Sequence, residues 1–560
     1  MTTSIFGSVV HRVEDPRFLT GRSRYVDDLR VEGALRAVFV RSIMSHARLV
    51  GMAVAEASSM PGVVAVLRAE DLDLAAQPPA GDVEGPLDRP VLAREVVRFV
   101  GEPIAMVVAE TLGQAQDAAE VFAIELDPLD VVVDPELAAE PGSPLLFPEA
   151  GTNVAAAFEQ DWDEDVLADA DVVVRVRVRH QRVAPVPMEG NAILAQPEAD
   201  DSLTLWVSTQ IPFDVRADVA EWLGLSRDTV RVVAPDVGGG FGAKLIVYPE
   251  YLAGAAAAVR LHRPVAWQDT RSESMVAMTH GRAQTHQVEL GATGEGMLVG
   301  LRVDILGDMG AYPIATYLPP TTQTMLPGVY VIPRVASRGR SVVTNTTPVA
   351  PYRGAGRPEA TLSIERAMDM LAAELGIDPI ELRRRNLIPK DAFPHTTAVG
   401  TVYDIGDYER VLDEALRLAD YRDLRRRQAE GRARGDRVVL GIGVCVYVEV
   451  TGSARKEFAS VTIEADGSAT VRVGTSSQGQ GHETAFAQVA SGVLGIAMER
   501  IRVVHSDTAD VARGEGTFGS RSLQIGGSSV FEAAEEVLDR ARHVAASLLE
   551  AAPQDVTVVG

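Results

Sequence analysis

A glycine-rich loop near residue 240 holds the residues of this 560-residue chain that are best suited to chemistry. It reads Val237-Gly238-Gly239-Gly240-Phe241-Gly242-Ala243-Lys244 and follows a strand-like run at 229–233. Glycines let a backbone turn tightly and bring its N–H groups close to a bound anion. A second such loop, Ser477-Gln478-Gly479-Gln480-Gly481-His482-Glu483-Thr484, follows a predicted strand at 469–473. Two such loops, far apart in the chain, predict a large anionic cofactor held from two sides.

The first loop also allows a nucleotide interpretation. Gly238, Gly240 and Ala243 fit the dinucleotide pattern G-x-G-x-x-[G/A], and Asp269 follows a later predicted strand. In that pattern the glycines open directly into a helix, whereas here residues 245–248 intervene. The sequence around Lys244 is not a P-loop, because no Ser or Thr follows it. A nicotinamide dehydrogenase and a purely structural glycine turn both stay open as alternatives.

The composition excludes several classes of partner. The chain has 53 basic and 78 acidic side chains and a formal net charge of −25. Nucleic acids and anionic membranes bind basic patches, so neither is an expected partner. No apolar run reaches the roughly 18 residues of a membrane span, and the start lacks the pattern of a secretory signal. We therefore expect a cytoplasmic protein.

Cys445 is the only cysteine in the chain. The β-rich pattern around it predicts a thiol buried in the core. A single cysteine excludes a disulfide framework, a zinc site of several thiolates and a cysteine-ligated iron–sulfur cluster within this chain. Electrons from any redox reaction must therefore leave through another chain or an organic cofactor.

The elements that must position the loops fall into three regions. The first contains a buried strand at 104–109, a helix that Thr111 caps and that runs to about Phe122, and a strand at 124–126, which together indicate a β-α-β unit. Prolines and glycines at 134–152 indicate a linker. The second region mixes strands at 171–178, 203–207 and 299–306 with helices at 249–260 and 358–375.

A basic stretch, 422–437, is expected to be an exposed connection to the third region. That region starts near Val438 with strands and continues with a helix near 485–494 and a strand at 501–505. An amphipathic helix is predicted at 531–549, and 556–560 resembles the start of another strand. The third region therefore appears unfinished on sequence alone.

The whole chain resembles the molybdenum-binding large subunit of the xanthine dehydrogenase and aldehyde oxidase family, in the branch similar to aerobic carbon monoxide dehydrogenase. The segments that carry the resemblance occur in the family's order along the full length. They are Gly101 to Ala105, Ala118 to Glu120, Gln181-Arg182, Pro187 to Glu189, Ser208 to Gln210, Pro235 to Lys244, Ala350 to Glu359, Asp378 to Arg383 with Asn386-Leu387, Gln478 to Thr484, and Gly516 to Ser522.

The resemblance implies a mixed α/β (α+β) fold in three parts. Residues 1–140 would form an N-terminal hammerhead-like α/β domain. Residues 153–425 would form a first molybdopterin-binding domain, and residues 437–560 a related second one that is truncated. The implied cofactor is molybdopterin cytosine dinucleotide with molybdenum. The implied partners are a small subunit with [2Fe–2S] clusters and a medium subunit that binds FAD.

The resemblance also implies roles for particular residues. Gly240, Phe241 and Gly242 would approach the metal end of the cofactor, and Gln210 would donate a hydrogen bond to an oxygen on the metal. Arg353 would orient the substrate and stabilise developing negative charge. No side chain is expected to bind the metal directly. The pterin, its phosphates and the nucleotide would be wrapped by Gln478, Gly479, Gln480, Gly481 and His482 together with Thr517, Phe518, Gly519, Ser520, Arg521 and Ser522.

The implied activity is oxidation of an aldehyde or N-heterocycle with water as the oxygen source. Carbon monoxide is disfavoured because Gly354 stands where the family's carbon monoxide dehydrogenases carry a copper-binding cysteine. Xanthine is disfavoured because Leu245 stands where xanthine-type members place a glutamate. The family's catalytic glutamate lies near its C-terminus, beyond Gly560. Glu295, in a predicted polar turn, is no convincing substitute. A separate C-terminal fragment as a further partner and an inactive, truncated member therefore both stay open.

Overall fold

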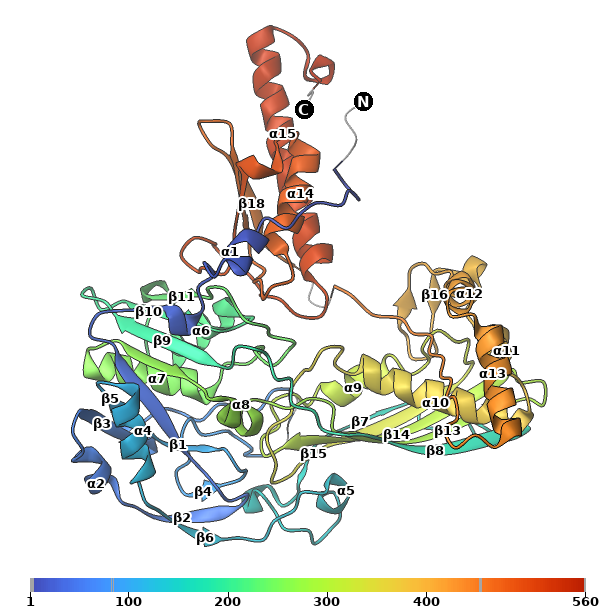
Figure 1. Ribbon diagram of the computed structural model, residues 1–560, viewed down its shortest axis with the longest axis horizontal. Coiled ribbons are helices and arrows are strands. Elements are labelled where there is room, and N and C mark those ends of the chain that lie inside the picture. Colours follow the sequence, from blue (N-terminus) through green and yellow to red (C-terminus); the bar gives the residue numbers. More distant parts are fainter. Residues whose placement is uncertain (1–4, 82, 84, 453–455, 558–560) are drawn as a thin grey trace.

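The computed structural model describes residues 5–81, 83, 85–452 and 456–557. Two bodies built on sheets lie side by side, and the C-terminal region stands above them (Figure 1). The N-terminal segment with helix α1 (Asp15–Leu19) lies between the C-terminal region and the body that carries β11.

The first body is a seven-stranded sheet with strands from both the N-terminal and the middle region. Its helices include α4 (Leu112–Glu120), α6 (Pro212–Trp222) and α7 (Pro249–Leu261). Strand β5 is buried along its whole length, as its apolar run predicts. In order across the sheet, the strands are β11 (Val230–Val233), β10 (Leu203–Val207), β9 (Ala192–Pro197), β12 (Val265–Gln268), β1 (Leu35–Arg41), β5 (Pro103–Ala109) and β3 (Val63–Arg68).

The predicted β-α-β unit is wrong in its pairing, although its elements are present. Thr111 caps α4, because its Oγ1 accepts a hydrogen bond from Gln114 N at 3.3 Å. The following strand, β6 (Ile124–Pro128), joins a separate small sheet with β2 (Ala47–Met52) and β4 (Val96–Val97). Strand β5 instead pairs antiparallel with both β1 and β3, so these long-range pairings decide the topology.

The second body is a five-stranded sheet that packs against the long helix α10 (Arg357–Leu375). Helix α10 ends where Gly376 adopts a left-handed backbone with φ +67°, as predicted. Helices α9 (Leu318–Gln323) and α11 (Pro379–Asn386) contact α10, whereas α8 (Arg271–Ala277) follows β12 and pairs through Glu273 with Arg41 of β1. In order, the strands are β7 (Val154–Gln160), β15 (Val335–Val343), β14 (Leu298–Gly310), β13 (Gln284–Ala292) and β8 (Val172–His180).

Two segments predicted as connections contain helices. The basic stretch forms α13 (Tyr421–Arg434), which follows α12 (Tyr408–Leu418), because Arg426 pairs with Glu430 one turn away. The expected linker at 134–152 contains α5 (Pro135–Ala138) and buries Leu146 and Phe147 in a hydrophobic cluster. Its prolines and glycines mark turns within a packed segment.

The C-terminal region pairs a three-stranded sheet with two helices. The strands are β18 (Ala459–Ile463), β19 (Ala469–Val473) and β20 (Ile501–Val504). Helix α14 (His482–Leu494) packs against α15 (Ser528–Leu549), which a π-helical turn, η6 (Ser522–Gly527), precedes. The strand predicted at 556–560 is not formed at 556–557, and 558–560 lie outside the described residues.

The prediction of a buried Cys445 is wrong. Residues 440–450 run extended without joining a sheet, and their side chains alternate between half-buried and exposed. Val444, Val446 and Val448 pack on the core of the second body. Cys445 belongs to the opposite face and is exposed, because the segment has only one side covered.

Candidate functional site

A buried ion pair anchors the first glycine loop. Glu189 Oε2 accepts hydrogen bonds from Gly238 N at 2.8 Å, Ser208 Oγ at 2.7 Å and Lys244 Nζ at 3.1 Å. Lys244 is 0% exposed, and burial lowers its pKa, while the Glu189 carboxylate opposes that shift. The pair therefore fixes the loop near both of its ends, at Gly238 and at Lys244.

Half of the N–H groups of the first loop donate to acceptors in the protein itself. Besides Gly238, the N–H groups of Gly239, Gly242 and Ala243 donate to Val237 O, Gln210 Oε1 and Gly240 O. Helix α7 begins only at Pro249, so no helix N-terminus opens from the loop. A pyrophosphate would find few donors here, and the geometry therefore disfavours the nicotinamide alternative. Among the described residues, no acceptor is present for the N–H groups of Gly240 and Phe241 at its tip or for those of Val237 and Lys244 at its ends.

Gln210 links the first loop to the segment at 516–522. Its Oε1 accepts from Gly242 N at 2.9 Å, and its Nε2 donates to Thr517 O at 2.7 Å. A Cβ at Gly240 would lie 2.5 Å from Gln210 Oε1, so only glycine allows this close approach. An amide nitrogen carries two N–H groups, which leaves one for a ligand.

The first loop is also joined to the segment that carries Arg353. Phe241 adopts φ +56°, a strained backbone for a non-glycine residue, and its carbonyl accepts from Arg353 N at 2.8 Å. Gly242 has φ +97°, and a Cβ there would lie 2.4 Å from Pro351 O. The Phe241 ring is 44% exposed, so the tip presents an aromatic face beside Arg353.

Arg353 is held through its backbone while its side chain stays exposed. Arg282 donates to Arg353 O at 2.6 Å and to Tyr352 O at 3.0 Å, and the buried Glu359 pairs with Arg282 at 3.4 Å. The Arg353 guanidinium makes no hydrogen bond or ion pair with any residue that the structure describes. A fixed main chain with an uncommitted guanidinium suits the orientation of a carbonyl or ring nitrogen.

The segment at 516–522 is bound to Gln210 and to Ser476, the residue before the second glycine loop. Thr517 N donates to Gln210 O at 3.1 Å, and Thr517 Oγ1 accepts from Ser476 N at 3.0 Å. Arg521 is fully buried and pairs with Glu457 at 2.5 Å, with its guanidinium over the Phe518 ring. The Arg521 side chain thus braces the segment from inside, whereas Ser520 and Ser522 are at least partly exposed.

The second glycine loop opens directly into α14. Gly481 is the residue before the helix and has φ +83°, and Gly479 is exposed with φ +99°. Among the described residues, the N–H groups of Gln480, Gly481, His482 and Glu483 have no acceptor. A helix N-terminus with unpaired N–H groups favours an anion such as a phosphate.

The His482 side chain is buried beside the second loop. It packs against the Phe486 ring at 5.3 Å between centroids, and its Nδ1 lies 3.4 Å from Thr475 Oγ1. Burial, with a smaller contribution from the neighbouring His505, lowers the pKa of His482 to about 3. His482 is therefore a neutral core residue whose N–H group, and not its ring, faces the loop.

The structure brings together all the segments predicted to form the site. Hydrogen bonds connect the first loop to Gln210 and Arg353, Gln210 to Thr517, and Thr517 to the segment before the second loop. Sequence reasoning missed Lys244, Glu189 and Arg282 as the residues that hold these loops. Lys244 and Glu189 lie in the family-like motifs, which is their only signal, and Arg282 lies outside those motifs. No group of three or more His, Cys, Asp or Glu side chains among the described residues could hold a metal ion.

The fold and these loops define a protein that binds a large, anionic organic cofactor. Family profiles identify which one. Residues 20–130 match the aldehyde oxidase and xanthine dehydrogenase a/b hammerhead domain, and residues 146–387 and 414–560 match molybdopterin cofactor-binding domains. The chain belongs to the molybdenum-binding large subunits of the xanthine dehydrogenase family, whose members are molybdenum-dependent oxidoreductases.

Relatives of known activity support this assignment along the whole chain. The nicotine 6-hydroxylase large subunit of Paenarthrobacter nicotinovorans is 37% identical over 100% of this chain and 71% of its own length. The carbon monoxide dehydrogenase large chain of Hydrogenophaga pseudoflava is 36% identical over 97% of this chain and 72% of its own. The crystal structure of quinoline 2-oxidoreductase from Pseudomonas putida 86 superposes with a TM-score of 0.94 at 35% identity, covering 99% of this chain and 73% of that one.

The described part of the chain contains no helix that is both long and apolar enough to cross a lipid bilayer.

Proposed function

We propose that the chain is the catalytic large subunit of a molybdenum hydroxylase that oxidises an N-heteroaromatic ring or an aldehyde, with water as the oxygen source. The observation that carries this proposal is the exposed Arg353 guanidinium, fixed through its backbone beside the tip of the first loop. The relatives that act on nicotine and quinoline support the N-heterocyclic substrate class. Gly354 follows Arg353 directly, and Cys445 lies beside Glu365 and Arg383 instead, which supports a site without copper and disfavours carbon monoxide.

The residues present fit molybdopterin cytosine dinucleotide. The N-terminus of α14 would bind the phosphates, and Ser520 and Ser522 would bind the nucleotide end. Gln210 would direct its second amide N–H to an oxygen at the metal end, beside the N–H groups of Gly240 and Phe241. When bound, this cofactor supplies two-electron oxidation coupled to oxygen insertion from water. Arg353 would orient the substrate and stabilise negative charge that develops on it.

The partners proposed are a small subunit with [2Fe–2S] clusters and a medium subunit with FAD. Several relatives are large subunits of multi-subunit enzymes. Cys445 is the only cysteine of the chain, so the clusters would have to be held by another chain. The large subunit would then pass electrons from the cofactor to its partner, and the cytoplasm would be the compartment where the complex works.

The test is to co-express the chain with its partner subunits in a host that makes the molybdenum cofactor. We expect bound molybdenum and CMP, and dye reduction with quinoline, nicotine or benzaldehyde, but not with xanthine or carbon monoxide. Arg353→Met should lower kcat/KM by about 100-fold through loss of charge stabilisation. Arg366→Met, an exposed arginine on α10, is the matched control. A complex that lacks molybdenum, or one that oxidises carbon monoxide fastest, would refute the proposal.

A further inference from the structure

The N-terminal segment crosses between the two glycine loops. We call residues 5–24 the N-terminal strap. Its early part lies along α14, where Gln488 Nε2 donates to Ile5 O at 3.3 Å and to Ser8 O at 3.1 Å. Further along the strap, Val13 N donates to Thr484 Oγ1 at 2.9 Å, in the first turn of α14. The strap thus approaches the helix end that we propose binds phosphates.

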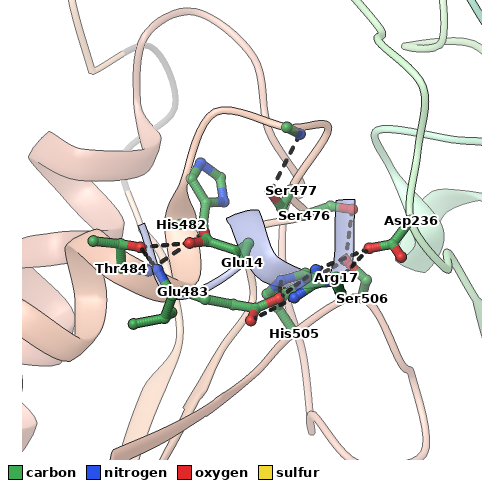
Figure 2. Close-up of polar contacts among 12 residues, drawn as sticks. Glu14, Arg17, Asp236, Ser476, Ser477, His482, Glu483, Thr484, His505 and Ser506 are labelled. Carbon is green, nitrogen blue, oxygen red and sulfur yellow. Dashed lines mark hydrogen bonds and ion pairs between the residues drawn. The ribbon is translucent and has the colours of Figure 1, made fainter. Parts of the chain in front are cut away.

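Glu14 caps this helix from a position 470 residues away in the sequence. It is 2% exposed, and its carboxylate accepts hydrogen bonds from Thr484 N at 3.4 Å and from Thr484 Oγ1 (Figure 2). A carboxylate at this place stabilises the helix through the N-terminal N–H groups. Glu14 accepts from the N–H group of Thr484 and leaves the N–H groups of His482 and Glu483 for a ligand.

Arg17 binds one carboxylate from each glycine-loop segment. Its Nη1 and Nη2 donate to the two oxygens of Glu483 at 2.9 and 2.7 Å, and its Nε and Nη2 donate to Asp236 Oδ1 at 3.2 and 2.9 Å (Figure 2). Asp236 directly precedes the first loop, and Glu483 lies in the first turn of α14. Arg24 N also donates to Asp236 Oδ2 at 3.0 Å.

Other contacts join the same two regions and would hold them together without Arg17. Ala234 N donates to Ser506 O at 2.8 Å, and Arg231 pairs with Asp507 at 2.5 Å. These contacts link β11 to the segment after β20 and do not touch either glycine loop. Loss of Arg17 should therefore leave the fold intact and loosen the loops.

We propose that Glu14 and Arg17 are positioning residues that fix the first loop and the start of α14 relative to each other. The proposal rests on the proposed function, in which one cofactor spans both loops. Such a cofactor is held at both of its ends only while the distance between the two loops is fixed. A guanidinium between two carboxylates suits this task, since its planar donors define direction as well as distance. The strap would therefore slow release of the cofactor without touching the substrate.

The first experiment measures cofactor release from the purified complex. Molybdenum and CMP that remain bound are followed over time after dilution into buffer with a chelator. Arg17→Met and Glu14→Gln should release the cofactor about tenfold faster, because one of two linked contacts is weakened. Arg17→Lys should be intermediate, since a point charge cannot pair with both carboxylates. KM for the substrate should not change.

The matched control is Arg22→Met, which removes another strap arginine whose side chain, among the residues that the structure describes, binds only Thr20. It should release the cofactor at the wild-type rate. Release by Arg17→Met at that same rate would overturn the proposal. So would an equal loss of thermal stability in the apo and loaded proteins with no change in release, because that is the result of a purely structural role.

A second measurement separates this proposal from the proposed function. Hydrogen–deuterium exchange of the chain without cofactor should be faster in Arg17→Met at both 238–243 and 482–485, with β5 unchanged. If the wild-type complex carries no molybdenum, the proposed function fails, yet the exchange result still decides the role of the strap. Unchanged exchange at both loops would contradict the positioning role.

Discussion

The two glycine-rich loops are similar in sequence but differ in what their backbones bind. The first, at 237–244, bonds half of its N–H groups within the protein and rests on the buried pair of Lys244 and Glu189. The second, at 477–484, is partly exposed and opens into α14 with four N–H groups that lack acceptors among the described residues. A high glycine content therefore indicates that the backbone of a loop comes close to another group. The surrounding side chains decide whether that group is part of the protein or a ligand.

This difference separates two tasks. The anchored first loop is a rigid surface that suits contacts of defined geometry, such as those expected at the metal end of the cofactor. The second loop combines a helix N-terminus with glycine flexibility, which suits a charged phosphate group. Four predictions test this division, and they are ordered by their expected effect on the free energy of unfolding.

The largest effect is expected from breaking the buried pair under the first loop. Lys244→Met leaves the Glu189 carboxylate buried without its partner, which costs about 3–5 kcal/mol. The double variant Lys244→Met with Glu189→Gln should recover part of this loss. The control on the second loop is Gln480→Ala, an exposed side chain whose loss should change stability by less than about 0.5 kcal/mol. Denaturant unfolding of the chain measures all three, and equal stability of Lys244→Met and Gln480→Ala would contradict the comparison.

Alanine at one glycine of each loop should give unequal losses. Gly242 and Gly479 both have left-handed backbones, with φ +97° and +99°. An added Cβ at Gly242 would lie 2.4 Å from Pro351 O, whereas at Gly479 it meets no atom within 4 Å. The backbone strain alone costs about 1–3 kcal/mol at either site, and overpacking adds about 1–3 kcal/mol at Gly242 only. Thermal unfolding of Gly242→Ala and Gly479→Ala decides this, and similar midpoints would show that the first loop is less tightly packed than the structure indicates.

Acid should destabilise the second loop through His482. The pKa of His482 is about 3 in the folded protein because of burial, below its ordinary value of 6.5. Between these values the unfolded chain binds a proton that the folded chain does not, so stability falls as the pH drops from about 6.5 towards 3. At pH 4 this amounts to about 3 kcal/mol for one group.

The measurement is the unfolding free energy of wild type and His482→Gln from pH 7 to pH 4. The variant should lose less stability over this range, although it starts from a lower value at pH 7. The unfolding free energy of both proteins should still fall with pH because of other buried histidines. One of them is His180, whose pKa burial lowers to about 4. Parallel pH profiles of the two proteins would show that His482 is not the titrating group.

The parts of the site that sequence could predict are those with a local signal. Prolines and glycines marked the bounds of α7 and α10, because proline fits a first helical turn and glycine a left-handed end. The glycine loops, Gln210 and Arg353 were found through motif resemblance. The structure brings these segments into one hydrogen-bonded set, while their roles toward the cofactor stay predictions.

The parts that sequence could not predict depend on partners far away in the chain. Lys244 pairs with Glu189, which is 55 residues away in the sequence, and Arg17 pairs with Glu483, which is 466 residues away. No local pattern indicates such pairs. The exposure of Cys445 was missed for a related reason, because an alternating pattern does not say which face of a strand is covered. Strand β6 left the sheet of β5 because of long-range pairing with β2.

The smallest effect is expected at Thr517, which joins Gln210 to Ser476, the residue before the second loop. Its Oγ1 accepts from Ser476 N at 3.0 Å. Its main-chain N–H donates to Gln210 O, and its main-chain carbonyl accepts from Gln210 Nε2. Thr517→Ala removes only the hydroxyl and should cost about 1 kcal/mol, the net value of one hydrogen bond. Thr517→Ser keeps the hydroxyl and is the control. Since the main-chain bonds to Gln210 stay, hydrogen exchange should rise in the second loop and not in the first, and a rise in both would mean that the two loops move as one unit.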